Sequence, residues 1–137
     1  MTPANQWKAA VVLLVSLGIS ITESWAGSAE DRIRSHFSIP ASALLTEETI
    51  KQAVLRVLPV GSPAISIRRK LLDLGIGEGG LSRYIESEKD NVAVIRIEYD
   101  SKTFEVVKKS YIISIHLTSD PIRTIQDVTV KEWLTGS

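Results

Sequence analysis

The chain has 137 residues, 44% hydrophobic and 23% charged, which is typical of globular sequences and allows one domain of moderate size. Sixteen basic residues balance sixteen acidic ones, so the chain lacks the basic excess of a nucleic-acid binder, and no nucleic acid partner is expected. With no cysteine and two histidines, a disulfide framework, a lipidated N-terminal cysteine and a structural zinc site of cysteine and histidine are excluded.

The N-terminal stretch has the layout of a secretory signal peptide. Lys8 precedes an uncharged, mostly apolar run from Ala9 to Ile21, and small residues at Ser24 and Ala26 suit a signal peptidase. We therefore predict a signal peptide over residues 1–26, cleavage near Ala26, and a periplasmic or secreted mature protein. The alternative is an uncleaved anchor in the inner membrane, although the apolar run is shorter than the roughly 20 residues of a spanning helix.

Residues 27–43 are polar and mixed in charge, and no sustained period of apolar residues runs through them. We interpret this segment as a polar leader or tether. Its large apolar residues, Ile33, Phe37 and Ile39, are expected at most to dock on the domain that follows. A single α+β domain is therefore predicted to span residues 44–137.

An amphipathic helix is predicted at the start of this domain. In TEETIKQAVLRVLP, apolar residues recur every three to four positions from Ile50 to Leu58. Thr46 is the expected N-cap, and Pro59 ends the helix.

A second helix is predicted over GSPAISIRRKLLDLG, with Ser62 as the cap and Pro63 at the first helical position. Leu71 lies on its apolar face, and Gly75 closes it in a Schellman motif. The glycines of GIGEGG (75–80) match the spacing of a dinucleotide-binding loop, but that loop must leave a strand and open a helix. Here they follow a helix, whose terminal carbonyls repel phosphate, so no nucleotide is expected.

Beyond Gly80 the apolar period changes to two, which predicts β-strands. NVAVIRIEYD and FEVVKKSYIISIHL both alternate, and a hairpin turn at Asp100–Lys102 is expected to make them antiparallel neighbours. IRTIQDVTVKEW also alternates, but Ile125 is out of phase with Val128 and Val130. A bulge near Gln126 and Asp127 would place all three on the core side. Asp120-Pro121 marks the turn before this strand. LSRYIES is a weaker candidate for a fourth strand.

The predicted fold class is α+β, with two N-terminal helices packed on one face of a three- to four-stranded antiparallel sheet as a two-layer sandwich. The other face mixes polar and apolar side chains, as an ordinary solvent face also does, and such faces can receive a protein partner. The residues predicted to bind a partner there are Val94, Arg96, Lys108, Ser110, Ile112, Ser114 and His116.

No catalytic, cofactor-binding or metal-binding residues are predicted. His116 shares the expected strand face with Ser110 and Ser114, which is the nearest approach to a base beside a nucleophile. The alternative function is therefore a small periplasmic hydrolase or ligand-binding protein that uses these three residues. His36 has no spaced partners, and the scattered carboxylates offer no pair for acid and base catalysis.

The export signal, the stretch VLPVGSPAISIRRKLLDLGI and the antiparallel sheet together resemble the BamE (SmpA/OmlA) outer-membrane assembly lipoproteins and the related β-lactamase inhibitor protein repeats. In that group a turn ending in glycine precedes a helix that closes on Leu-Gly, and Val60-Gly61-Ser62 and Leu74-Gly75 stand in those places. The resemblance covers about residues 44–132. It implies this order of elements and the binding of another protein through the sheet or its edge. Because the chain has no cysteine, it does not imply their lipid anchor.

The leading hypothesis is a non-enzymatic, exported protein-binding module of the envelope-assembly or inhibitor type. Its expected partner is another envelope protein, and no cofactor is expected. A membrane becomes a partner only if the signal segment is not cleaved.

Overall fold

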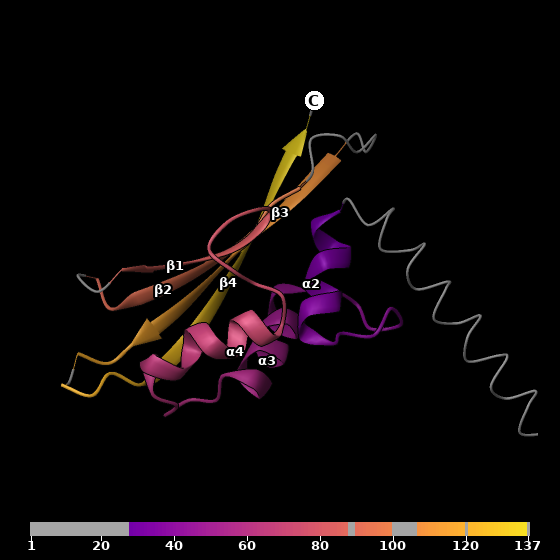
Figure 1. Ribbon diagram of the computed structural model, residues 1–137. Helices are drawn as coiled ribbons and strands as arrows, with labels where there is room; N and C mark the ends of the chain where they lie inside the picture. Colours follow the sequence, from indigo (N-terminus) through magenta and orange to yellow (C-terminus); the bar gives the residue numbers. More distant parts are fainter. Residues whose placement is uncertain (1–27, 88–89, 100–106, 120, 137) are drawn as a thin grey trace, which may run out of the picture.

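The computed structural model describes residues 28–87, 90–99, 107–119 and 121–136. The predicted signal peptide at 1–26, the hairpin turn at Asp100–Lys102 and Asp120 lie outside these residues. The described part is an α+β fold in which three helices and a short 3₁₀ turn precede a four-stranded antiparallel sheet (Figure 1). The predicted fold class is confirmed, with one more helix than expected.

The additional helix, α2 (Ala29–Phe37), lies in the segment that the sequence pattern indicates to be a leader or tether, and that interpretation is wrong. Ser28 caps the helix by accepting a hydrogen bond from the backbone N–H of Asp31 at 3.1 Å. Ala29, Ile33 and Phe37 are spaced four residues apart and form one buried stripe. Residues 28–43 are therefore part of the domain, because their apolar side chains join its core.

Helix α3 (Glu47–Val57) begins and ends as predicted. The Thr46 hydroxyl accepts a hydrogen bond from the backbone N–H of Thr49 at 3.0 Å. Ile50, Ala53 and Val54 are buried on its inner face. The helix thus presents its apolar stripe to the sheet, where it packs mainly on β4.

The second predicted helix begins later than expected, because the backbone of its first residues bonds to β4 instead. Gly61 N–H donates to the carbonyl of Ile125 at 2.8 Å, and Ile125 N–H donates to the carbonyl of Ser62 at 2.9 Å. Ser62 therefore does not cap a helix and Pro63 is not a helical residue. A 3₁₀ turn, η1 (Ala64–Ser66), comes next and leads into α4 (Ile67–Asp73).

Helix α4 ends in the predicted Schellman motif. Gly75 has φ +92°, a left-handed conformation that glycine adopts without a side-chain clash. Ile76 N–H donates to the carbonyl of Leu71 at 2.9 Å, and Gly75 N–H donates to that of Leu72 at 3.0 Å. The next regular element of the described chain is strand β1, so the glycines of residues 75–80 open no helix.

The strands are β1 (Ser82–Ser87), β2 (Val92–Ile97), β3 (Val107–Leu117) and β4 (Ile125–Gly136), and they lie side by side in chain order. The register passes from His116–Asp127 to Leu117–Ile125, so Gln126 is the extra residue of a bulge. Ile125 and Val128 are consequently both buried. The predicted fourth strand, the antiparallel pairing and the bulge are confirmed.

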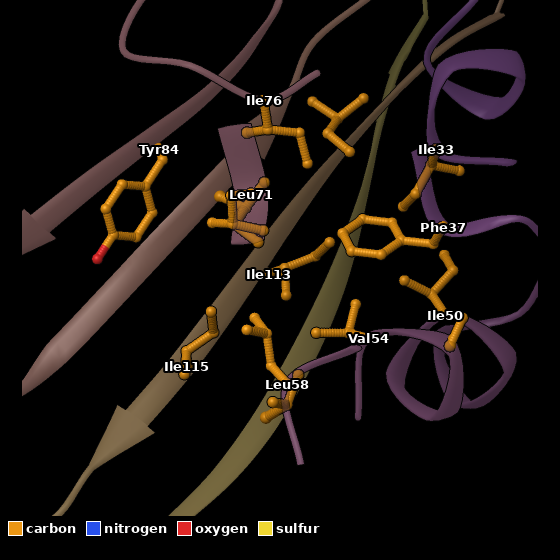
Figure 2. Packing of buried hydrophobic residues seen from close by; sticks show 14 of the residues in the cluster. Ile33, Phe37, Ile50, Val54, Leu58, Leu71, Ile76, Tyr84, Ile113 and Ile115 are labelled. Carbon is orange, nitrogen blue, oxygen red and sulfur yellow. The ribbon is translucent and has the colours of Figure 1, made fainter. Parts of the chain in front are cut away.

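The core lies between the helices and one face of the sheet (Figure 2). Alternate strand residues point into it: Ala93, Ile95, Ile97, Tyr111, Ile113, Ile115 and Leu117. Helices α2, α3 and α4 contribute Ile33, Ile50 and Leu71, all fully buried. Because side chains alternate along a strand, the intervening residues face away from the helices.

Both edges of the sheet are partly covered. Tyr84 N–H of β1 donates to the carbonyl of Gly77 at 2.7 Å. At the opposite edge, residues 61–64 pair with the start of β4, and the Glu47 carboxylate accepts a hydrogen bond from Glu132 N–H at 3.0 Å. These contacts reduce the unpaired backbone that an added strand would need.

Candidate partner-binding face

The candidate site is the sheet face that the helices leave open. Figure 1 shows α2, α3 and α4 on one side of the sheet, and no described helix lies on the other. We call this second side the outer face. It carries Arg83 and Ile85 of β1, the outward residues of β2 and β3, and Asp127, Thr129, Lys131 and Trp133 of β4.

The structure brings all seven predicted site residues together on the outer face, and the strand register fixes their neighbours. Val94 is opposite Ser114, Arg96 is opposite Ile112, and His116 is opposite Val92. Ser110 and Lys108 are the next outward residues along β3. The predicted strand register is therefore confirmed, since Ile113 and Ile115 are fully buried while Ile112 is only partly so.

A row of four side chains crosses the middle of this face. In order from β1 to β4 it consists of Arg83, Arg96, Ile112 and Lys131. The two arginines share the carboxylate of Glu98, which lies 2.8 Å from Arg83 and 3.9 Å from Arg96. Ile112 therefore lies between two cationic side chains, Arg96 on one neighbouring strand and Lys131 on the other.

The two edge strands add side chains to the outer face that the sequence pattern did not indicate. Trp133 lies opposite Ser110 and is 49% exposed, and Ile85 is 47% exposed. The Lys131 ammonium lies 4.9 Å from the centre of the Trp133 ring, within the range of a cation–π contact. The signal was present, because the bulge at Gln126 places positions 127, 129, 131 and 133 on the outer face.

The geometry gives little support to the alternative function, in which His116 forms a catalytic pair with Ser110 or Ser114. Its Nε2 atom is hydrogen-bonded to the Thr129 hydroxyl at 3.0 Å, while the Ser110 hydroxyl accepts from the backbone N–H of Tyr99 at 3.3 Å. Within the described ranges, no hydrogen bond joins His116 to Ser110 or Ser114. The same residues contain no group of three metal-ligating side chains close enough to hold an ion.

A groove of about 510 Å³ lies on the opposite side, between η1 and the residues that precede β4. Its apolar wall includes Ile65, 89% exposed, and Ile122, 75% exposed. Its two arginines are engaged already: Arg68 pairs with Glu78, and Arg123 lies 3.0 Å from Glu86. The groove therefore has less free charge to offer a ligand than the outer face has.

His36 has a structural role that its position in the sequence did not indicate. Its Nδ1 lies 2.7 Å from the carbonyl of Leu74, and its Nε2 lies 2.8 Å from the Ser82 hydroxyl. Because a carbonyl only accepts, Nδ1 must donate, and Nε2 of the neutral ring accepts from Ser82. A Cβ at Gly75 would approach the ring to 3.3 Å. One imidazole thus ties α2 to the end of α4 and to β1.

This arrangement predicts that acid weakens the fold. Burial lowers the pKa of His36 below its usual 6.5; the hydrogen bond to Leu74 opposes that effect, and the charge of Arg32 adds to it. Since the folded state favours the neutral ring, the His36 contribution is complete above about pH 6.5 and is lost as the pH falls toward the lowered pKa. Urea denaturation should show that the free energy of unfolding falls more between pH 7 and pH 5 in the wild type than in His36→Gln.

His116→Gln is the matched control, because it removes a histidine and keeps the His36 contribution. Equal losses of stability between the two pH values in wild type and His36→Gln would contradict the assignment of the neutral ring.

Comparisons of the chain with protein-family models, with curated proteins and with solved structures gave no match. The resemblance to BamE-type lipoproteins therefore stays a prediction. Over the residues that the structure describes, no helix has the length and apolar character needed to span a membrane.

Proposed function

We propose that this protein is a non-enzymatic, exported protein-binding module and that the outer face is its binding surface. The observation that supports this most is the open outer face itself. It combines a half-exposed tryptophan with a central isoleucine and several cations, while the helices cover the other face. Tryptophan and arginine are enriched among the residues that dominate binding energies at protein interfaces.

The proposed place of action is the periplasm or the exterior, and the proposed partner is another envelope protein, in assembly or inhibition. Export rests on the N-terminal sequence alone, with its apolar run and the small residues Ser24 and Ala26. The resemblance to BamE-type lipoproteins supports the same class of function. The missing cysteine argues against a lipid anchor.

Export predicts that the mature protein begins at Gly27. An intact-mass measurement on protein purified from its host is expected to give the mass of residues 27–137. The mass of the whole chain, found in the membrane fraction, would favour an uncleaved anchor instead.

Binding through the outer face predicts a selective defect in Ile112→Glu. The new carboxylate would be desolvated beneath a partner, where loss of an anchor residue typically costs about 2 kcal/mol or more of binding free energy. In the free protein Ile112 is partly exposed on a face without a covering helix, so the melting temperature should change little. Crosslinking pull-downs from envelope extract, run beside thermal melts, measure both effects.

Leu72→Glu is the matched control, since Leu72 is 54% exposed on α4, on the helical side of the sheet. It should keep the partner that the wild type captures. If Ile112→Glu also keeps that partner with an unchanged melt, the outer face is not the binding surface.

A further inference from the structure

The outer face carries more positive than negative charge, although the chain as a whole is neutral. Its basic side chains are Arg83, Arg96, Lys108 and Lys131, and the acidic ones beside them are Glu98 and Asp127. Both acids are already engaged. Glu98 contacts the two arginines, and Asp127 lies 3.5 Å from Lys51 of α3.

The two lysines, in contrast, have no acidic partner among the described residues. Each lies over an aromatic ring instead, with Lys108 at 5.2 Å from the centre of Tyr99 and Lys131 at 4.9 Å from that of Trp133. A ring attracts a cation without neutralising its charge, so both ammonium groups remain available to a carboxylate.

Two of the cations lie on either side of Ile112, the apolar residue at the centre of the outer face. Arg96, Ile112 and Lys131 stand on neighbouring strands in one row. Neighbouring strands are about 4.8 Å apart, so the two cations flank the isoleucine across roughly 10 Å of backbone. A partner that presents an apolar side chain between two carboxylates would match this row in both charge and hydrophobicity.

Building on the proposed function, we propose that the outer face binds an acidic protein segment in which carboxylates flank an apolar residue. A protein segment fits better than an anionic lipid surface, because the cations of this face alternate with the apolar side chains of Ile112 and Trp133, a mixed pattern that a continuous layer of negative headgroups does not match. The Ser114 hydroxyl also suits a peptide, because a hydroxyl can donate and accept and a peptide offers both kinds of partner.

Tryptophan fluorescence provides the test. In the full chain with Trp7→Phe and Trp25→Phe, Trp133 is the one remaining tryptophan and reports on the outer face directly. The probes are a short synthetic peptide in which glutamates flank leucines, the same peptide with glutamine for each glutamate, and vesicles of phosphatidylglycerol and phosphatidylcholine.

The acidic peptide is expected to change Trp133 emission and to bind with a Kd about tenfold below that of the glutamine peptide. Raising the ionic strength should weaken it. Lys108→Gln combined with Lys131→Gln should remove most of this preference. Arg69→Gln, which removes an exposed cation of α4, should leave it unchanged.

Equal affinity for the two peptides, or no response to either, would overturn the proposal of an acidic partner. A response to the vesicles alone would also overturn it and would assign the face to a membrane surface. If the charge preference is absent but Ile112→Glu still loses its partner in the pull-down, this inference is wrong and the proposed function stands. If Ile112→Glu keeps its partner, the proposed function is wrong as well.

Discussion

Replacing Phe37 with alanine is expected to lower the free energy of unfolding by about 3–5 kcal/mol. Phe37 is 3% exposed and ends α2, and Figure 2 shows its ring directed from the helix into the core cluster. The substitution would leave a cavity between α2, α3 and the sheet, since a packed interior collapses only in part. Urea denaturation of the two proteins at neutral pH measures the difference.

Ser35→Ala is the matched control, because Ser35 is exposed on the same helix. Its effect should stay within about 0.5 kcal/mol. An equally small effect of Phe37→Ala would mean that residues 28–43 are a tether after all and that the domain begins near residue 44.

Leu71→Ala is expected to cost about 2–5 kcal/mol of unfolding free energy. Leu71 is fully buried, and its carbonyl accepts the Ile76 N–H in the motif that ends α4. The adjacent Leu72 is 54% exposed, so Leu72→Ala offers a matched deletion of the same atoms at the surface. Chemical denaturation should show a small loss for Leu72→Ala, and equal losses for the two variants would place the wrong face of α4 against the sheet.

The strands could be predicted because one of their faces is buried. Alternation of apolar residues places Tyr111, Ile113 and Ile115 on a single side, and a slip of one residue would expose them all. The bulge is predictable for the same reason, since Ile125 and Val128 can both reach the core only with an extra residue between them.

Helix α2 was missed because its apolar stripe is one residue wide. Only Ala29, Ile33 and Phe37 are buried on a helix that is otherwise polar, and they are stabilised by contacts with distant parts of the chain. A local signal did exist. Ser28 is followed by acidic residues in the first turn, and Arg34 and His36 lie in the last, as helix capping and the macrodipole favour.

The start of α4 was misplaced for a different reason. Ser62 and Pro63 are favourable residues for the beginning of a helix, but the backbone from Gly61 to Ala64 bonds to the chain around Ile125. Those partners are far away in the sequence, so local capping patterns cannot reveal them. Tertiary contacts have overridden a local preference here.

The part of the candidate site on β2 and β3 could be predicted, because the alternation within these strands could be. The alternation in β2 and β3 placed Arg96, Ile112 and His116 on one face, and the structure agrees. The role of Trp133 depends on β4 lying next to β3, which alternation within one strand does not determine. The contacts of His36 join three elements and required the three-dimensional structure.

The proposal that the outer face binds a protein partner is tested most directly by photocrosslinking in the native host. A photoreactive benzoylphenylalanine is placed at position 112 on the outer face or at position 72 on exposed α4, each in the otherwise unchanged chain. We expect a discrete crosslinked species from position 112 and none from position 72. The same species from position 72, with none from position 112, would show that the partner binds the helical side and would contradict the assignment of the outer face.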